Sequence, residues 1–310
     1  MALKFNEKNH PYIDLGSGFQ IYLQDECCRH GAEMEARART FINESPQSVA
    51  RGMAELRKLI AADPDINLPV ESDWYLNLYL RAGFYDPQKA LAIVQANSRQ
   101  KAKTPEYFAP IKSLRHVYEE GVVWMLPERD DDGAVVIIAE SGKRWNTSKV
   151  TVDQLNSAVS ALVGVLTLSE EAQLHGIKLI FDMDGLAMSH IMQCTPKSTA
   201  IMLNLMENCS TVRTVNVHTI NTGMVYNMLY SVIKPLQSKR MREIMVMHTR
   251  NLSSLNKYIN PKILPPRLGG TSKAPICDGP LFAELMMCYD EWLSTTLLPF
   301  GYTRKSSISS

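Results

Sequence analysis

The sequence has almost no net charge, few cysteines and no long apolar run. Its 33 basic and 32 acidic side chains leave a net charge of +1, which argues against a general nucleic-acid-binding protein. The longest nearly apolar run, Ala158 to Leu168, is shorter than the ~20 residues that cross a bilayer. The six cysteines include no CxxC pair, so neither a zinc site nor a disulfide framework is indicated. The N-terminus lacks the apolar segment of a secretion signal, and we expect a cytoplasmic protein with reduced thiols.

Most catalytic motifs are absent as well. No Gly-x-Ser-x-Gly occurs, and no Gly-x-Gly-x-x-Gly follows an expected strand, which argues against a serine hydrolase and a dinucleotide site. The seven histidines show no metal-ligand spacing. His190, His218 and His248 lie on or beside apolar segments, where structural histidines are more common than ligands. We therefore predict no catalytic residue, no metal and no cofactor.

One motif leaves an enzymatic alternative open. Phe181–Gly185 ends an apolar segment in Asp-x-Asp-Gly, as phosphatases of the haloacid dehalogenase type begin, where the first aspartate is the nucleophile. Such a site also needs a downstream acidic pair for Mg²⁺, and after Asp184 only Asp278 and Asp290 follow. We favour the other interpretation, in which Asp182 and Asp184 cap the turn after a strand.

The pattern of apolar residues changes near residue 120. Residues 1–20 predict a loose arm, and residues 21–120 predict short helices, with Ser45-Pro46 opening one of them. From Gly121 onward, β-branched segments alternate with helical ones, which is typical of βαβ units and a mostly parallel sheet. We predict an α/β protein with an all-helical N-terminal lobe at 21–120, a sheet lobe at 121–275 and a C-terminal extension at 276–310. The predicted strands are residues 122–126, 134–139, 176–181 and 211–217.

Methionine and apolar residues are concentrated in the second half of the chain. Ten of the 16 methionines lie between Met183 and Met247. Methionine suits surfaces that repack around variable apolar shapes, although plain core filling is the common alternative. Residues 223–233 form a helix too apolar to be solvated. Packing on a sheet covers one side of it, and the other side needs a ligand or a membrane, unless it is an ordinary central helix.

A cluster of basic residues follows this apolar helix. Between residues 234 and 250, five basic side chains face a single acid, Glu243. A solvated helix face is the usual interpretation of such a cluster. Beside an apolar helix, a surface for anionic lipid head groups is better motivated. The five basic residues are Lys234, Lys239, Arg240, Arg242 and Arg250.

Taken together, these segments resemble the CRAL-TRIO (Sec14-like) lipid-binding family, and most closely its tocopherol-transfer and retinaldehyde-binding branch. Gly176–Gly185 resembles the family's central strand and turn, and Val217–Asn221 its next strand. Leu264–Gly270 resembles the closing LP-x-x-x-GG motif, and Tyr79–Ala82 the FLRA motif of the helical lobe. The resemblance covers about residues 50–275.

The resemblance implies a cavity between the sheet and an apolar gate helix, holding one hydrophobic molecule and carrying out no catalysis. The predicted function is a cytoplasmic carrier that is peripheral at membranes, monomeric and without a nucleic-acid partner. A membrane adaptor that uses lipid only as an address is the alternative to a carrier. Because the helix after Thr151 presents few polar groups, we expect an isoprenoid, a retinoid, tocopherol or a similar lipid. The residues expected to line the cavity are Val159, Leu162, Val163, Leu166, Ile180, Val215, Val217, Met224, Val225, Met228, Leu229 and Val232.

The resemblance also implies an anionic head-group site. In the tocopherol-transfer branch a phosphoinositide head group binds a basic patch, and Arg213 and Arg240 fall at matching positions. Gly83 and Ile244 stand at two other positions of that patch and are not basic. We therefore expect attraction to anionic membranes, with phosphoinositide as one candidate lipid. The expected head-group residues are Arg213, Lys234, Lys239, Arg240 and Arg242.

Overall fold

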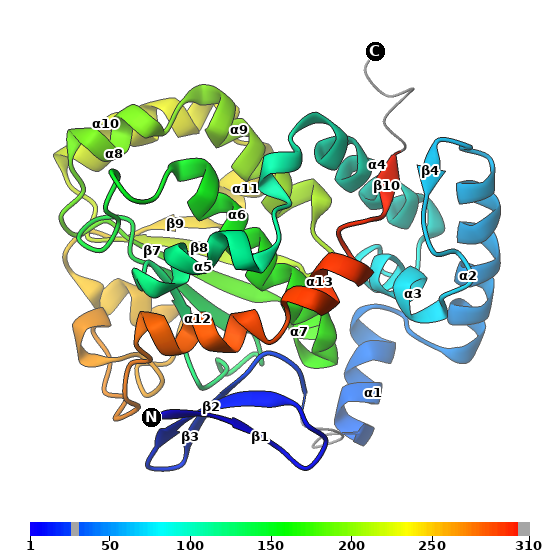
Figure 1. The fold of residues 1–310 in the computed structure, drawn as a ribbon, viewed down its shortest axis with the longest axis horizontal. Coiled ribbons are helices and arrows are strands. Elements are labelled where there is room, and N and C mark those ends of the chain that lie inside the picture. The colour runs from blue at the N-terminus through cyan, green and yellow to red at the C-terminus, as the bar shows by residue number, and fades with distance from the viewer. Residues whose placement is uncertain (26–30, 303–310) are drawn as a thin grey trace.

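The computed structural model describes residues 1–25 and 31–302, so Cys27, Cys28 and the serine-rich tail at 306–310 lie outside it. Its centre is a five-stranded sheet in the order β5-β6-β7-β8-β9 (Figure 1). The strand β5 is antiparallel to β6, and the other neighbours are parallel. A mostly parallel sheet with helical connections confirms the predicted α/β class. The five strands are β5 (Val123–Met125), β6 (Val135–Ala139), β7 (Ile177–Asp182), β8 (Thr214–Ile220) and β9 (Met245–Met247).

Helices surround this sheet and also build a separate lobe beside it (Figure 1). The helices of the N-terminal half are α1 (Gly31–Phe41), α2 (Pro46–Ala61), α3 (Asp73–Ala82), α4 (Pro87–Lys103), η1 (Pro105–Tyr107) and α5 (Ile111–Glu119). The middle of the chain forms α6 (Val152–Val165), η2 (Leu166–Leu168), α7 (Glu170–His175), α8 (Met188–Gln193), α9 (Pro196–Asn204) and the π-helical turn η3 (Leu205–Cys209). The remaining helices are α10 (Met224–Ile233), η4 (Lys234–Leu236), α11 (Lys239–Ile244), η5 (Leu252–Lys257), η6 (Pro266–Leu268), α12 (Gly279–Met287) and α13 (Asp290–Thr296).

The first 22 residues correct one expectation. They form a three-stranded antiparallel sheet rather than a loose arm: β1 (Ala2–Phe5), β2 (Pro11–Gly16) and β3 (Phe19–Tyr22). Alternate residues of β2 point inward, so that Ile13 and Leu15 are buried in the main core. A short alternating strand followed by a glycine turn was the signal for this hairpin. Two further short strands, β4 (Ile66–Asn67) and β10 (Gly301–Tyr302), pair with each other.

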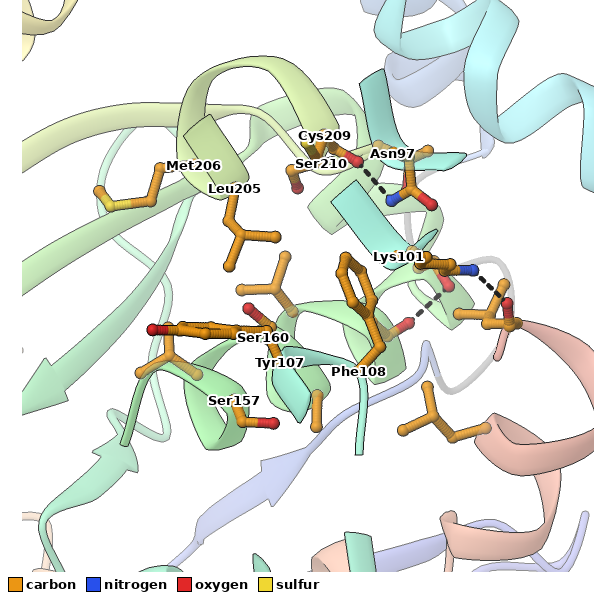
Figure 2. A pocket seen from close by; sticks show the side chains of 18 of the residues that line it. Asn97, Lys101, Tyr107, Phe108, Ser157, Ser160, Leu205, Met206, Cys209 and Ser210 are labelled. Carbon is orange, nitrogen blue, oxygen red and sulfur yellow. Dashed lines mark hydrogen bonds between the residues drawn. The ribbon is translucent and has the colours of Figure 1, made fainter. Parts of the chain in front are cut away.

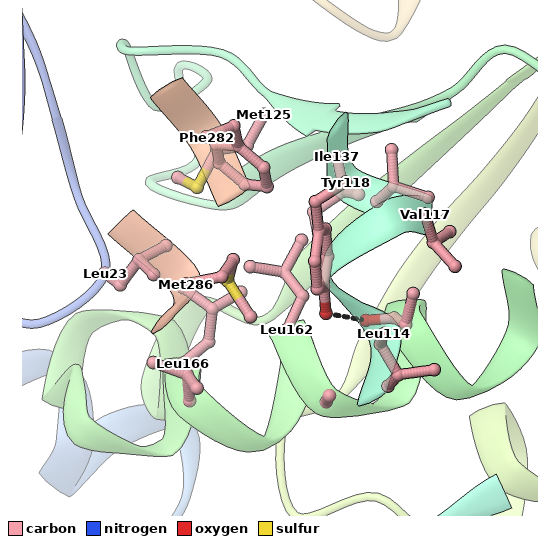
Figure 3. Close-up of a cluster of buried hydrophobic side chains, with 14 of the residues drawn as sticks. Leu23, Leu114, Val117, Tyr118, Met125, Ile137, Leu162, Leu166, Phe282 and Met286 are labelled. Carbon is pink, nitrogen blue, oxygen red and sulfur yellow. Dashed lines mark hydrogen bonds between the residues drawn. The ribbon is translucent and has the colours of Figure 1, made fainter. Parts of the chain in front are cut away.

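One face of the central sheet is covered by α5, α6 and α12 (Figure 3). Tyr118 of α5 lies against Phe282 of α12 and donates a hydrogen bond to the carbonyl of Ala158 in α6 at 2.7 Å. Phe282 and Met286 are fully buried. Residues after 275 therefore belong to the main core together with the sheet lobe.

The other face of the sheet is covered by η5 and the loop that follows it. Leu255, Leu264 and Leu268 pack there against strand residues such as Ile138. Steric constraints explain why two glycines end the LP-x-x-x-GG motif. Gly269 adopts a left-handed φ of +78°, and a Cβ on Gly270 would meet the carbonyl oxygen of Leu264 at 2.0 Å.

The FLRA motif joins the helical lobe to the sheet lobe. The guanidinium of Arg81 in α3 pairs with Glu44 at 2.9 Å and donates to Gln173 in α7 at 3.1 Å. Most of its side chain is buried. A fork-shaped donor suits this junction because it can bind two elements at once. The FLRA motif therefore holds the helical lobe in place against the sheet lobe. The helical lobe forms one wall of the cavity that is described below.

Candidate functional site

A cavity of about 120 Å³ lies between α6, the starts of β7 and β8, and the helical lobe (Figure 2). Apolar side chains from the sheet, Ile177 and Leu179, form part of its wall. The π-helical turn η3 adds Leu205 and Met206, and the segment after α13 adds Leu297. Elements from both lobes and the C-terminal segment thus enclose one apolar space.

The helix α6 separates the cavity from the main core. Thr151 caps its start by accepting the backbone N–H of Gln154, which confirms the predicted helix start. Of the four residues of α6 and the start of η2 that were predicted to line the cavity, Val159 and Val163 do so. Leu162 and Leu166 lie on the opposite face, fully buried near Tyr118 and Phe282 (Figure 3). Because α6 is apolar on both faces, its sequence could not show which face lines the cavity and which faces the core.

The end of the cavity at the helical lobe has more polar groups than the apolar sequence of α6 led us to expect. The buried hydroxyl of Tyr75 makes no hydrogen bond of normal geometry. Lys101 donates to the carbonyls of Leu297 and Phe300 at 2.6 and 3.0 Å, and burial lowers its pKa to about 8. Asn97 donates to the carbonyl of Cys209 at 2.8 Å (Figure 2). Donors with spare capacity therefore lie at this end of an otherwise apolar space.

The predicted sheet residues do not line the cavity. Ile180 is buried on the opposite sheet face, beneath Leu255. Val217 is buried on the face toward α6, paired with Leu179, but it lies beyond the cavity wall. Val215 is half-buried beside Gly176. Ile177 and Leu179 of β7 form the floor of the cavity instead. Because side chains alternate between the two faces of a strand, both lie on the face opposite to Ile180, and this alternation was the signal for them.

The apolar helix α10 packs one face inward and leaves the other bare. Tyr226, Leu229 and Ile233 are buried against Met183 and neighbouring side chains. Met224 is 84% exposed on the outer face. None of the α10 residues predicted as cavity lining reaches the cavity. They are Met224 and Met228, which are exposed, Val225 and Val232, which are half-buried, and Leu229, which is buried on the inner face.

Five exposed methionines lie on α8, on α10 and at the end of β9, which are neighbours in the fold, and we call this set the methionine face. The pairs Met188/Met192 on α8 and Met224/Met228 on α10 each have helical i, i+4 spacing, and α8 and α10 lie side by side (Figure 1). Met247 ends β9 next to the start of α10, where the N–H of Thr222 donates to the carbonyl of His248. Exposed apolar side chains in one group mark an interaction surface.

A basic site lies where α1 meets the start of β8. The guanidinium of Arg213 lies 4.6 Å from the ring of Phe41 and 5.7 Å from that of Phe84. Burial and the nearby charges of Arg240 and Arg37 lower the pKa of Arg213 to about 10. Arg37 itself lies over Phe41 at 5.4 Å. The sequence missed Arg37, Phe41 and Phe84 because only the tertiary fold brings α1 against β8.

The remaining predicted head-group residues are exposed. Lys234 lies in η4, and Lys239 and Arg242 lie in α11 with Arg240. They follow α10 directly in the chain. Arg213 differs, because it is half-buried and also donates weakly to the carbonyls at the end of α7.

The two aspartates of the Asp-x-Asp-Gly motif hold a turn together. Asp182 accepts a hydrogen bond from the side chain of Asn221 at 2.8 Å and from the N–H of Asp184 at 3.0 Å. Asp184 pairs with Lys143 at 2.5 Å. Within residues 1–25 and 31–302, no group of acidic, histidine or cysteine side chains could hold a metal ion. The described contacts give Asp182 the turn-capping role, whereas the carboxylate of Asp184 binds Lys143.

The three histidines singled out in the sequence are buried and hydrogen-bonded. His190 accepts from the N–H of Ala187 and contacts the carbonyl of Trp145, each at 2.8 Å. His218 and His248 lie within hydrogen-bond distance of each other at 3.1 Å. Burial, then the charges of His248 and Lys178, lower the pKa of His218 to about 3. All three rings thus pack inside the fold.

A second, wider groove lies between β3, α1 and α7 and has a volume of about 1050 Å³. Its charged residues are largely paired with one another. Arg81 binds Glu44, and Arg129 binds Glu171 at 2.7 Å. The lining of this groove combines these ion pairs with apolar side chains such as Phe19 and Leu126. None of the helices in the described part of the chain is long and apolar enough to cross a membrane.

The fold and the cavity define an α/β protein that encloses an apolar space between a sheet and a helical lobe. Residues 119–270 match the family described as the CRAL/TRIO domain. Clavesin-1 from Xenopus laevis is 23% identical over 239 residues, which cover 76% of this chain and 72% of that protein. The human alpha-tocopherol transfer protein-like protein is 25% identical over 248 residues, which cover 79% and 72%. The chain belongs to the CRAL-TRIO family of lipid-binding and transfer proteins.

A solved structure agrees with this assignment at the level of the fold. The crystal structure of Sfh5 matches with a TM-score of 0.50 and 14% sequence identity, covering 81% of this chain and 99% of that chain. At this identity the match supports the shared architecture of helical lobe and sheet.

Proposed function

We propose that this protein carries one hydrophobic molecule in its internal cavity and exchanges it at anionic membranes. The observation that carries the proposal is the apolar space enclosed by Val159 and Val163 of α6 and by Ile177 and Leu179 of β7. Family membership supports it, because CRAL-TRIO proteins bind hydrophobic small molecules. The adaptor alternative predicts binding to membranes without transfer of cargo between them.

The cavity must widen when the molecule enters. Its volume of about 120 Å³ is well below the roughly 300–1,000 Å³ of typical ligand pockets. Met206 and Phe108 line it and are only partly buried, so both can change rotamer. Methionine is suited to such repacking because its side chain is unbranched and flexible. We propose that the cargo has a long apolar part, as in an isoprenoid, a retinoid or tocopherol, with one polar group near Tyr75.

Two surface features favour a membrane as the place of exchange. The methionine face offers apolar side chains for insertion, and the basic residues after α10 offer attraction to anionic lipid. We propose Arg37, Arg213 and Arg240 as the site of a phosphate-bearing head group. Three neighbouring cations and two aromatic walls favour a compact anion over diffuse attraction alone.

Filling the cavity tests the carrier proposal. We expect Val163→Phe to reduce the amount of retinoid, tocopherol or fatty-acid probe bound by delipidated protein at least tenfold, because the new ring occupies the space. Val163→Ile adds one methylene and should bind within about threefold of the unchanged protein. Binding is measured by fluorescence titration, with circular dichroism to check the fold. Equal binding by both variants, or no binding of any probe by the unchanged protein, contradicts the proposal.

Removing charge tests the membrane site. Arg37→Gln with Arg240→Gln should slow transfer to anionic vesicles by about ten- to a hundredfold, because each charge contributes about 1 kcal/mol near an anionic surface. Transfer to neutral vesicles and the affinity for the cargo should hardly change. The matched control, Arg51→Gln with Lys112→Gln, removes two exposed charges from α2 and α5. Equal slowing by the control pair, or on neutral vesicles, would assign the effect to net charge or to the fold.

A further inference from the structure

The methionine face has a chemical property that a membrane surface does not require. Leucine would serve insertion as well as methionine, since both are apolar and similar in volume. Apart from Met1, every methionine among the exposed large apolar residues belongs to this face. The exposed large apolar residues elsewhere are phenylalanine, tryptophan, tyrosine and leucine, none of which carries a thioether: Phe5, Phe41, Trp74, Phe84, Leu236 and Tyr258.

We propose that the methionine face is an oxidation site, at which a hydroperoxide converts thioethers to sulfoxides and so detaches the protein from membranes. The inference rests on the proposed membrane function and adds a chemical modification to it. The sulfur attacks the distal oxygen of the peroxide, the O–O bond breaks and an S=O bond forms. The proton passes to the departing oxygen, so that R₂S and R′OOH give R₂SO and R′OH. Sulfur is oxidised by two electrons and the peroxide is reduced.

Exposure determines which methionines react first. Met224 and Met192 are 84% and 78% exposed and should react fastest. Met188, Met228 and Met247 are about half exposed and should follow. The fully buried Met241 and Met286 serve as internal controls that should stay unmodified while the protein is folded.

Oxidation should weaken membrane binding because of where these side chains lie. A sulfoxide is polar and strongly hydrated, so it opposes insertion into the apolar part of a bilayer. The basic residues keep their charges, and attraction to anionic lipid therefore remains. We expect at least a tenfold loss of binding to vesicles once Met192 and Met224 are both oxidised. Reduction by methionine sulfoxide reductases should restore it, which makes the modification reversible.

The experiment treats the folded full chain with hydrogen peroxide and maps each sulfoxide by peptide mass spectrometry. Binding is then measured by flotation with vesicles of phosphatidylcholine and phosphatidylserine. The matched variant carries leucine at all five positions: Met188→Leu, Met192→Leu, Met224→Leu, Met228→Leu and Met247→Leu. Its binding before peroxide is its own reference, and it should keep that binding after peroxide because leucine has no sulfur to oxidise. Near-ultraviolet circular dichroism before and after treatment checks the fold.

The possible outcomes separate the two proposals. If the untreated protein does not bind these vesicles, the membrane function itself fails. If it binds, and full oxidation of Met192 and Met224 leaves binding unchanged, the oxidation proposal is wrong while the membrane function stands. Loss of binding in the leucine variant after peroxide would place the sensitive group elsewhere and also overturn it. Early oxidation of Met241 or Met286 would contradict the exposure argument.

Discussion

At the scale of single residues, burial sets the charge state of His218. The ring is fully buried on β8 beside His248 and Tyr258, with Lys178 nearby, and its Nε2 atom has no hydrogen-bond partner in the described part of the chain. Its pKa falls from an ordinary value near 6.5 to about 3. The folded protein therefore keeps His218 neutral at a pH where the unfolded chain binds a proton.

This difference predicts a loss of stability in mild acid. Because the pKa is lowered in the folded state, the stability that neutral His218 supports is present above pH 6.5 and is lost progressively as the pH falls toward 3. Between pH 7.5 and 5 the free energy of unfolding should fall by about 2 kcal/mol from this group alone. His218→Gln should flatten the profile by that amount in urea titrations at each pH.

At the scale of elements, α6 separates a core face from a cavity face. Leu162→Ala should lower the free energy of unfolding by about 2–5 kcal/mol, because the side chain is fully buried among core residues. Val159→Ala should cost about 1 kcal/mol or less, since Val159 borders space that is already open. Urea denaturation measures both. Equal losses for the two variants would show that the two faces are packed alike.

The sequence predicted the elements better than their faces. Ser45 and Thr151 gave correct helix starts, because a capping side chain is a local signal. The strand expected at 211–217 instead spans Thr214–Ile220, and residues 210–213 connect it to the π-helical turn η3. Periodicity shows that a residue is apolar without showing what it faces. For this reason Leu162 was expected at the cavity, and Met228 was expected inside although it lies on the surface.

The basic site shows the same limit at longer range. Arg213 and Arg240 were expected from their resemblance to family positions, and the structure brings their charges close enough to affect one another. Arg37 lies 176 residues before Arg213 in a helix that gave no sign of function. Only the packing of α1 against the start of β8 reveals it.

At the scale of the whole molecule, both ends of the chain complete the core. Ile13 from the N-terminal sheet and Phe282 from α12 belong to the same buried cluster as the central sheet. Phe282→Ala should therefore lower the free energy of unfolding by about 3–5 kcal/mol. Phe282→Leu should cost less, because it keeps most of the apolar volume. Thermal unfolding followed by circular dichroism compares the stability of the two variants. Unchanged stability in Phe282→Ala would show that α12 does not contribute to the core.

The small size of the empty cavity has a consequence for the kinetics of loading. Under the proposed carrier function, a space of about 120 Å³ cannot accept a lipid directly, so cargo must wait for a wider conformation that the protein visits only part of the time. Raising the concentration of cargo then speeds uptake only until the opening step becomes limiting. Beyond that point the rate reaches a plateau set by the protein alone, and a membrane crowded with cargo would load the carrier no faster than a moderately supplied one.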